Sequence, residues 1–132
     1  DRFGLRIGVA PPEVVDMMGT SAGEASATVA QRVARVRERA ASRGVHCNAD
    51  LPSARLDECA PLTADAESML EGALRAGALT GRGLHRVRRV ALTIADRDDH
   101  DGPIDRVHVA TALALRTVPA RFESEAVVSH GA

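Results

Sequence analysis

The chain has 132 residues, 45% of them hydrophobic and 27% charged, with a formal net charge of −1 at pH 7. These values are typical of one globular domain, and they do not indicate a strongly basic nucleic-acid surface over the whole molecule. All 17 basic residues are arginines, which excludes a phosphate-loop lysine, a Schiff-base lysine and a Ser-Lys dyad.

No apolar run approaches the roughly 18 residues that a membrane span needs, and no basic start precedes an apolar block. We therefore expect neither a membrane span nor a signal peptide, and a cytoplasmic location. Cys47 and Cys59 are too few for a disulfide scaffold, so free thiols are expected.

The first predicted element is a β-strand near the N-terminus. Phe3, Leu5, Ile7 and Val9 alternate with smaller or charged residues, and two prolines follow, which is the pattern of a strand with one buried face. A lone strand leaves its hydrogen-bonding edges unpaired. We therefore expect the strand to belong to a sheet whose other strands precede residue 1, and the chain to be a fragment.

The next two predicted elements are helices. From residue 24, apolar residues recur at helical spacing up to Ala40, with Ser26 as the predicted N-cap and Gly44 as the stop. The opposite face carries Arg32, Arg35 and Arg39, and we expect it to be solvated. A loop with a short helical piece at residues 53–58 follows. A second helix is then expected from the cap Thr63 to about Gly77.

Two further helices complete the predicted set. Residues 80–96 combine an N-cap at Thr80 with an apolar stripe, which consists of Leu84, Val87, Ala91, Ile94 and Ala95. A last helix is expected from Pro103, placed in its first turn, to about residue 116. Residues 117–132 lack a period and are expected to form a frayed tail. The fold class is thus mainly α, a small four-helix bundle preceded by one strand.

The arginines of the third helix allow two interpretations. Arg82, Arg86 and Arg89 lie opposite the apolar stripe, which by composition alone favours a solvated face. Arg82, however, sits in the first turn, where free N–H groups and the helix dipole attract anions. A phosphate there could be held by both the guanidinium and the helix.

Other clusters carry weaker signals. His46, Cys47 and Cys59 fit no zinc spacing, so a loop histidine and buried thiols are expected. His108 is interpreted as a hydrogen-bonded core histidine. The acidic run is interpreted as a solvated turn, because it lacks the order of a Ca²⁺ loop; it comprises Asp96, Asp98, Asp99 and Asp101.

Several segments resemble the magnesium-chelatase-type AAA+ ATPases, most closely their ComM-like branch, also called YifB. "DRFGLRI" at residues 1–7 is similar to the end of the AAA+ core, and "TGRGLHRVRRVALTIAD" at residues 80–96 is similar to the lid helix. "NADLP" at 48–52 and "HVATALALR" at 108–116 follow in the family's order. The resemblance implies a strand and linker of the core at 1–22, a helical lid domain at 23–116, and a tail at 117–132 that we expect to be disordered.

The resemblance also implies roles for particular residues. Arg2 matches the arginine finger that reaches nucleotide in the neighbouring subunit, and Asp1 matches its acidic neighbour. Arg82 matches the second sensor, which contacts the terminal phosphate of ATP in its own subunit. Arg86 and Arg89 have no assured counterpart and are expected at the surface or in subunit contacts. Neither Walker motif is present, so this chain alone is not expected to bind ATP tightly or hydrolyse it.

The resemblance implies a function for the full-length protein. This chain is expected to be the nucleotide-sensing lid of an ATPase, with the upstream AAA+ core of the same protein as its partner. The full-length protein is expected to use ATP and Mg²⁺, to form a ring, expected to be a hexamer, and to act on DNA by ATP-dependent branch migration. No cofactor is expected in the chain alone. Two alternatives stay open: a free-standing helical module whose arginines bind acidic protein or nucleic acid, and the lid of a true magnesium chelatase subunit.

Overall fold

The computed structural model describes residues 4–19 and 22–117, and these are mainly helical. The α-helices are α1 (Val14–Met18), α2 (Ser26–Ser42), α3 (Leu56–Cys59), α4 (Ala64–Arg75), α5 (Gly81–Arg97) and α6 (Arg106–Ala114), with 3-10 turns η1 (Asn48–Asp50) and η2 (Ser53–Arg55). The predicted fold class, a small helical bundle, is confirmed. In the described residues no helix has the length and apolar content needed to cross a membrane.

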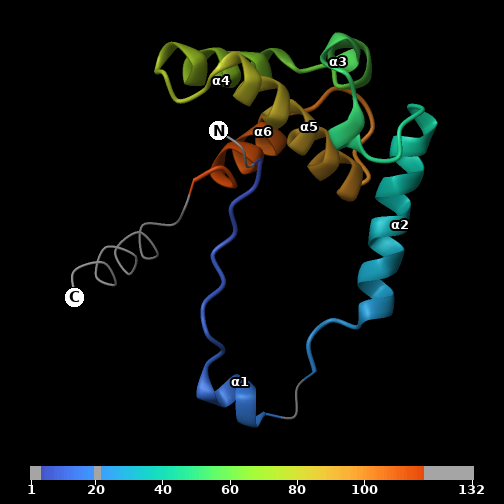
Figure 1. Ribbon diagram of the computed structural model, residues 1–132, viewed down its shortest axis with the longest axis vertical. Helices are drawn as coiled ribbons and strands as arrows, with labels where there is room; N and C mark the ends of the chain where they lie inside the picture. The colour runs from blue at the N-terminus through green and yellow to red at the C-terminus, as the bar shows by residue number, and fades with distance from the viewer. Residues whose placement is uncertain (1–3, 20–21, 118–132) are drawn as a thin grey trace.

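Helix α5 is the centre of the bundle (Figure 1). Helices α4 and α6 pack against it and against each other, while α3 and η1 cover further parts of its surface. Helix α2 stands beside this group and meets α5. The two chain segments before α4 and α6 join through a single parallel bridge between Leu62 and Ile104.

The core is built from aliphatic and small side chains. Val87 and Ala91 of α5 are at most 1% exposed, and so are Leu56 of α3 and Val109 of α6. Small side chains at the contacts let helices approach closely, so a core without described aromatic side chains still reaches dense packing. The stripe predicted along residues 84–95 is the face that α5 buries.

Side-chain caps fix where the helices begin. Thr63 Oγ1 accepts a hydrogen bond from the Ala66 N–H (3.2 Å), and Thr80 Oγ1 accepts one from the Gly83 N–H (3.0 Å). Both caps were predicted from the sequence. Helix α6 differs, because Asp105 caps it and Pro103 lies before it instead of in its first turn. Helix α2 also differs, since Ala25 occupies the N-cap and Ser26 is the first helical residue.

The strand predicted near the N-terminus does not form in residues 4–13. Its apolar side chains Ile7 and Val9 are 72% and 82% exposed. A strand needs a hydrogen-bonding neighbour, and the described residues supply none, because the segment is held by a bond from the Arg6 N–H to the Leu115 carbonyl (2.7 Å). The short helix α1 that follows was not predicted.

Helix α2 buries less of its apolar face than its pattern suggests. Ala40 is its only buried residue, whereas Val29 and Val33 are 41% and 49% exposed. Of the three arginines predicted to be solvated, Arg35 is exposed, whereas Arg32 and Arg39 are half-buried. All three are paired: Arg32 with Glu24, Arg35 with Asp99 and Arg39 with Asp101. The helix therefore joins the bundle at its C-terminal end and leaves its N-terminal half open.

Candidate functional site

Arg82 lies at the start of α5 and points into solvent. It is the second residue of the helix, between Gly81 and Gly83, and its side chain is exposed. It forms no hydrogen bond or ion pair with any other described residue. No acidic residue occupies the first turn, whose leading N–H groups lack intrahelical acceptors. A guanidinium and free N–H groups thus lie together, an arrangement that can bind an anion.

Arg89, a second arginine of this row, is engaged within the fold. Arg89 donates from Nε to the Leu51 carbonyl (2.9 Å) and from Nη2 to Ser53 Oγ (3.2 Å). It is half-buried and its guanidinium is engaged within the fold; its expected place at the surface or in a subunit contact stays a prediction. Arg86 is half-buried as well.

Arg88 closes the short helix α3 onto α5. Its Nη2 donates to the carbonyls of Leu56 (3.0 Å) and Ala60 (2.9 Å), and its Nη1 pairs with Asp57 Oδ1 (2.8 Å). A cation at the carbonyl end of a helix opposes the negative end of the helix dipole. Of Arg82, Arg88 and Arg89, the latter two are engaged within the fold, whereas Arg82 has no hydrogen bond or ion pair with another described residue.

A buried polar network joins α2, η1 and α5. Asp96, 1% exposed, accepts two bonds of 2.7 Å from Arg43, one at each carboxylate oxygen. Asn48 donates to Asp96 Oδ2 (2.8 Å) and to Thr93 Oγ1 (3.1 Å), and it accepts a bond from Arg43 (3.1 Å). The bonds to Asp96 raise the pKa of Arg43 above its ordinary value. A two-pronged, fully satisfied ion pair of this kind fixes the relative orientation of the helices that carry it.

This network overturns one prediction. Asp98, Asp99 and Asp101 are exposed, as expected of a solvated turn, but Asp96 is a buried anchor. The sequence held one signal for it: an acid in the last turn of a helix is opposed by the helix dipole, so its presence there calls for a compensating cation. Its partner Arg43 stands 53 positions earlier in the chain, which no local pattern reveals.

The remaining predicted site residues do not assemble. Arg2 and Asp1 lie outside the described residues, so the arginine-finger assignment stays a prediction. His46 bonds Arg37 (2.6 Å), and Cys47 donates to Asp50 (3.3 Å). Among residues 4–19 and 22–117, no group of three His, Cys, Asp or Glu side chains is placed to hold a metal ion.

His108 is a core histidine, as predicted. It is 4% exposed, and its Nδ1 accepts a hydrogen bond from the Asp105 N–H (3.1 Å). Its ring meets that of His100 edge to face, with centroids 4.7 Å apart. Burial, with a smaller effect from His100, lowers the pKa of His108. The neutral ring thereby acts as a capping acceptor for α6.

Comparison with known proteins places these features in a wider group. The family model described as magnesium chelatase, subunit ChlI C-terminal, matches residues 23–116. The chain is 37% identical over 119 residues to the uncharacterized protein YifB of Escherichia coli K12, and 34% identical over 119 residues to the competence protein ComM of Haemophilus influenzae Rd. Each alignment covers 89% of this chain and 23% of the relative. The chain therefore spans about a quarter of the length of these relatives.

Proposed function

Because the chain belongs to the magnesium chelatase, subunit ChlI C-terminal family, we propose that it is a nucleotide-sensing lid whose Arg82 contacts the terminal phosphate of ATP. The ATP is bound by an AAA+ core elsewhere in the same full-length protein, together with Mg²⁺. The lid itself supplies a positioned cation and no phosphate loop. We propose Arg2 as the arginine finger that reaches the nucleotide of a neighbouring subunit. The subunits are proposed to form a hexameric ring.

The observation that carries this proposal is the position of Arg82. Its guanidinium is exposed beside the N-terminus of a 17-residue helix and has no partner among the described side chains. A transferring phosphoryl group spreads negative charge over its oxygens, and arginine remains charged and offers paired N–H donors to them. The burial of the opposite face of α5 holds the backbone beneath Arg82 rigid.

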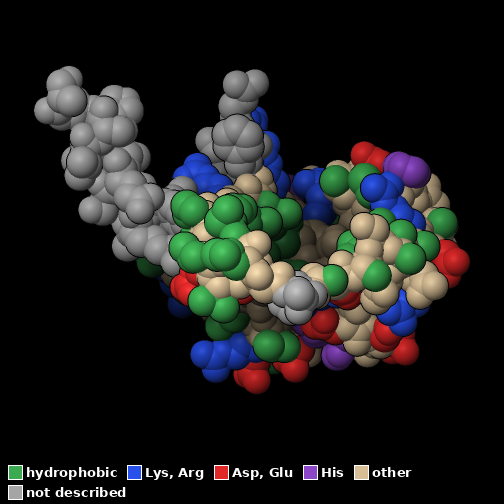
Figure 2. All heavy atoms as spheres, turned by 90° about the horizontal axis from the view of Figure 1, so that it is seen from below, with side chains coloured by type: hydrophobic (Ala, Val, Ile, Leu, Met, Phe, Trp, Pro, Cys, Tyr) green, Lys and Arg blue, Asp and Glu red, His purple; other side chains and the backbone are tan. Residues whose placement is uncertain are grey.

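The exposed N-terminal segment supports a neighbouring domain. Six large apolar side chains there are at least 70% exposed, namely Ile7, Val9, Val14, Val15, Met17 and Met18. Figure 2 shows hydrophobic side chains gathered over this segment, beside a hollow in the surface. Contiguous exposed apolar surface marks an interaction site. We assign it to contact with the AAA+ core, which accounts for apolar residues that the lid does not bury.

Action on DNA is the proposed task of the full-length protein. One relative is named a competence protein, and the lid helix is of the ComM-like type, for which ATP-dependent branch migration is the implied activity. The alternative of a true magnesium chelatase subunit rests on the family description. A free-standing helical module whose arginines bind acidic protein or nucleic acid has less support, because Arg88 and Arg89 are engaged within the fold.

Arg82→Ala in the full-length protein tests the proposal. We expect ATP turnover to fall about 10²- to 10³-fold, as when a donor to developing negative charge is removed, with the circular dichroism spectrum unchanged. Arg82→Lys should retain part of the activity, because the charge stays while the fork geometry is lost. The matched control is Arg106→Ala, which removes an exposed arginine from the first turn of α6. Equal turnover in the Arg82 and Arg106 variants would remove Arg82 from the site.

Branched DNA added to the wild-type protein separates the two assignments of substrate. Stimulated ATP turnover supports the DNA task. An ATP turnover rate that does not change with DNA but rises with a porphyrin substrate supports the chelatase alternative.

A further inference from the structure

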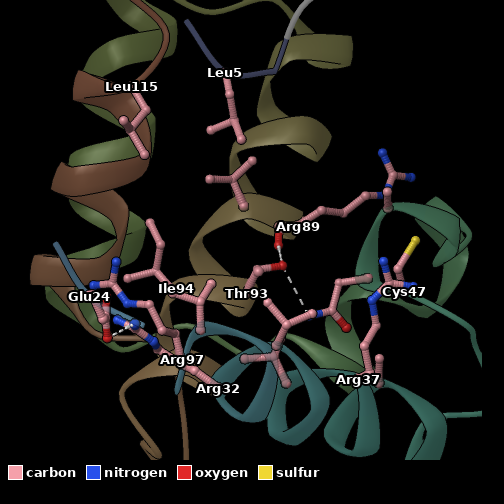
Figure 3. A pocket seen from close by; sticks show the side chains of 17 residues that line it. Leu5, Glu24, Arg32, Arg37, Cys47, Arg89, Thr93, Ile94, Arg97 and Leu115 are labelled. Carbon is pink, nitrogen blue, oxygen red and sulfur yellow. Dashed lines mark hydrogen bonds and ion pairs between the residues drawn. The ribbon is translucent and has the colours of Figure 1, made fainter. Parts of the chain in front are cut away.

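An apolar groove of about 660 Å³ lies between α2 and α5 (Figure 3). Its apolar lining includes Val29 and Val33 of α2, Val90 and Ile94 of α5, and Leu5 and Leu115 from the two ends of the described chain. We call it the α2/α5 groove. It is separate from Arg82, which is not among its lining residues.

The groove leaves apolar surface uncovered. Val33 is 49% exposed and Val29 is 41% exposed, although both line the groove together with residues of α5. Covering such surface is favourable by about 25 cal/mol for each Å² removed from water. A segment that occupied the groove would therefore be stabilised by covering the open half of α2.

The charged rim of the groove is predominantly basic. Its charged lining residues are Arg32, Arg37, Arg89, Arg97 and Glu24. Glu24 pairs with Arg32, whereas Arg97 is 54% exposed and, among residues 4–19 and 22–117, pairs only with its neighbour Asp98. A segment that combines apolar and acidic residues is complementary to a groove with an apolar floor and a basic rim.

Such a segment follows directly in the chain. Leu115 lines the groove, the described chain ends at Thr117, and residues 122–128 read "FESEAVV". This stretch places Phe122, Val127 and Val128 beside Glu123 and Glu125, with no basic residue among them. At up to about 3.3–3.6 Å per residue, the few residues from 118 to 121 are enough to leave α6 and enter the groove.

We propose that residues 122–128 dock in the α2/α5 groove of their own chain. Phe122 and the two valines cover the apolar floor, and the two glutamates face the rim arginines. The segment thereby fastens the open half of α2 to α5. The proposal does not depend on nucleotide sensing by Arg82, because it concerns another face of α5.

Cys47 provides the probe, because it lines the groove, and Cys59 provides the reference, because it packs against the core outside the groove. In the chain 1–132, iodoacetamide should alkylate Cys47 several-fold faster after Phe122→Ala, while the rate at Cys59 stays constant. His130→Ala, a change in the same tail outside the docking stretch, should leave both rates unchanged. Equal Cys47 rates in the wild type and Phe122→Ala would overturn the proposal.

A groove variant tests the other side of the contact. Val33→Glu adds an acid at an exposed position of the groove floor. It should raise the rate at which iodoacetamide alkylates Cys47, as Phe122→Ala does. Its matched control is Val107→Glu, on α6 and 62% exposed, which lies outside the groove. Protection of Cys47 that increases with protein concentration would overturn intramolecular docking, because it would identify a second copy as the occupant.

Discussion

At the scale of single residues, Asp96 and Arg82 represent opposite uses of charge on one helix. Asp96 is buried and fully paired, while Arg82 is exposed and has no described partner. The sequence predicted the placement of Arg82, because cap, stripe and charge all lie within one local pattern. It could not predict the pairing of Asp96, because Arg43 and Asn48 are 53 and 48 positions away.

Asp96→Asn tests the contribution of the network to stability. The amide removes the negative charge and leaves the Arg43 guanidinium, 18% exposed, without its counter-charge. Breaking a buried pair in this way costs about 3–5 kcal/mol, whereas breaking an exposed pair costs about 0–1 kcal/mol. We therefore expect urea unfolding of Asp96→Asn to show a loss near the lower end of the first range. Asp98→Asn, which affects the exposed pair with Arg97, is the control, and equal losses in the two variants would contradict a structural role for the network.

At the scale of elements, helices were predictable where local signals agreed. In α4 and α5, a threonine cap and an apolar stripe point to the same start and the same buried face. The strand at residues 3–9 had only a period of two to support it, and an extended segment acquires strand structure only from a neighbouring strand. The start of α6 was misplaced because Asp105 with His108 makes a stronger start signal than Pro103.

Thr80→Ala tests how far one cap holds α5. The change leaves the Gly83 N–H without its acceptor and should lower the free energy of unfolding by about 1 kcal/mol, within a range of about 0.5–2 kcal/mol. Thr111→Ala is the matched control, because the Thr111 hydroxyl only bonds back to the Val107 carbonyl within α6, and alanine is the better helix former. Urea unfolding gives both values. A loss for Thr111→Ala as large as that for Thr80→Ala would show that hydroxyl loss in general, and not the cap, sets the cost.

At the scale of the whole molecule, the chain divides into a packed bundle and an open N-terminal segment (Figure 1). Helix α1 has no buried residue, and the hydrogen bond that ties residues 4–19 to the bundle joins Arg6 to Leu115. The family match begins at residue 23, close to where this open segment ends. The sequence predicts a domain boundary after residue 22. Because residues 4–19 pack so little against the bundle, this boundary can be tested by truncation.

A chain of residues 23–132 should therefore unfold as cooperatively as the chain 1–132. The expected loss is at most about 1.5 kcal/mol, the upper value for one intramolecular hydrogen bond, with a small addition from Leu5, which is itself 49% exposed. Binding of an apolar dye such as ANS should fall, because the exposed valines and methionines of α1 are removed. The control is a chain of residues 44–132, which also lacks α2 and Arg43 and should lose stability by several kcal/mol, since Asp96 is then buried without its cation. If the two truncated chains lost stability equally, residues 1–22 would have to be counted as part of the bundle, and the open segment would be a packed element in solution.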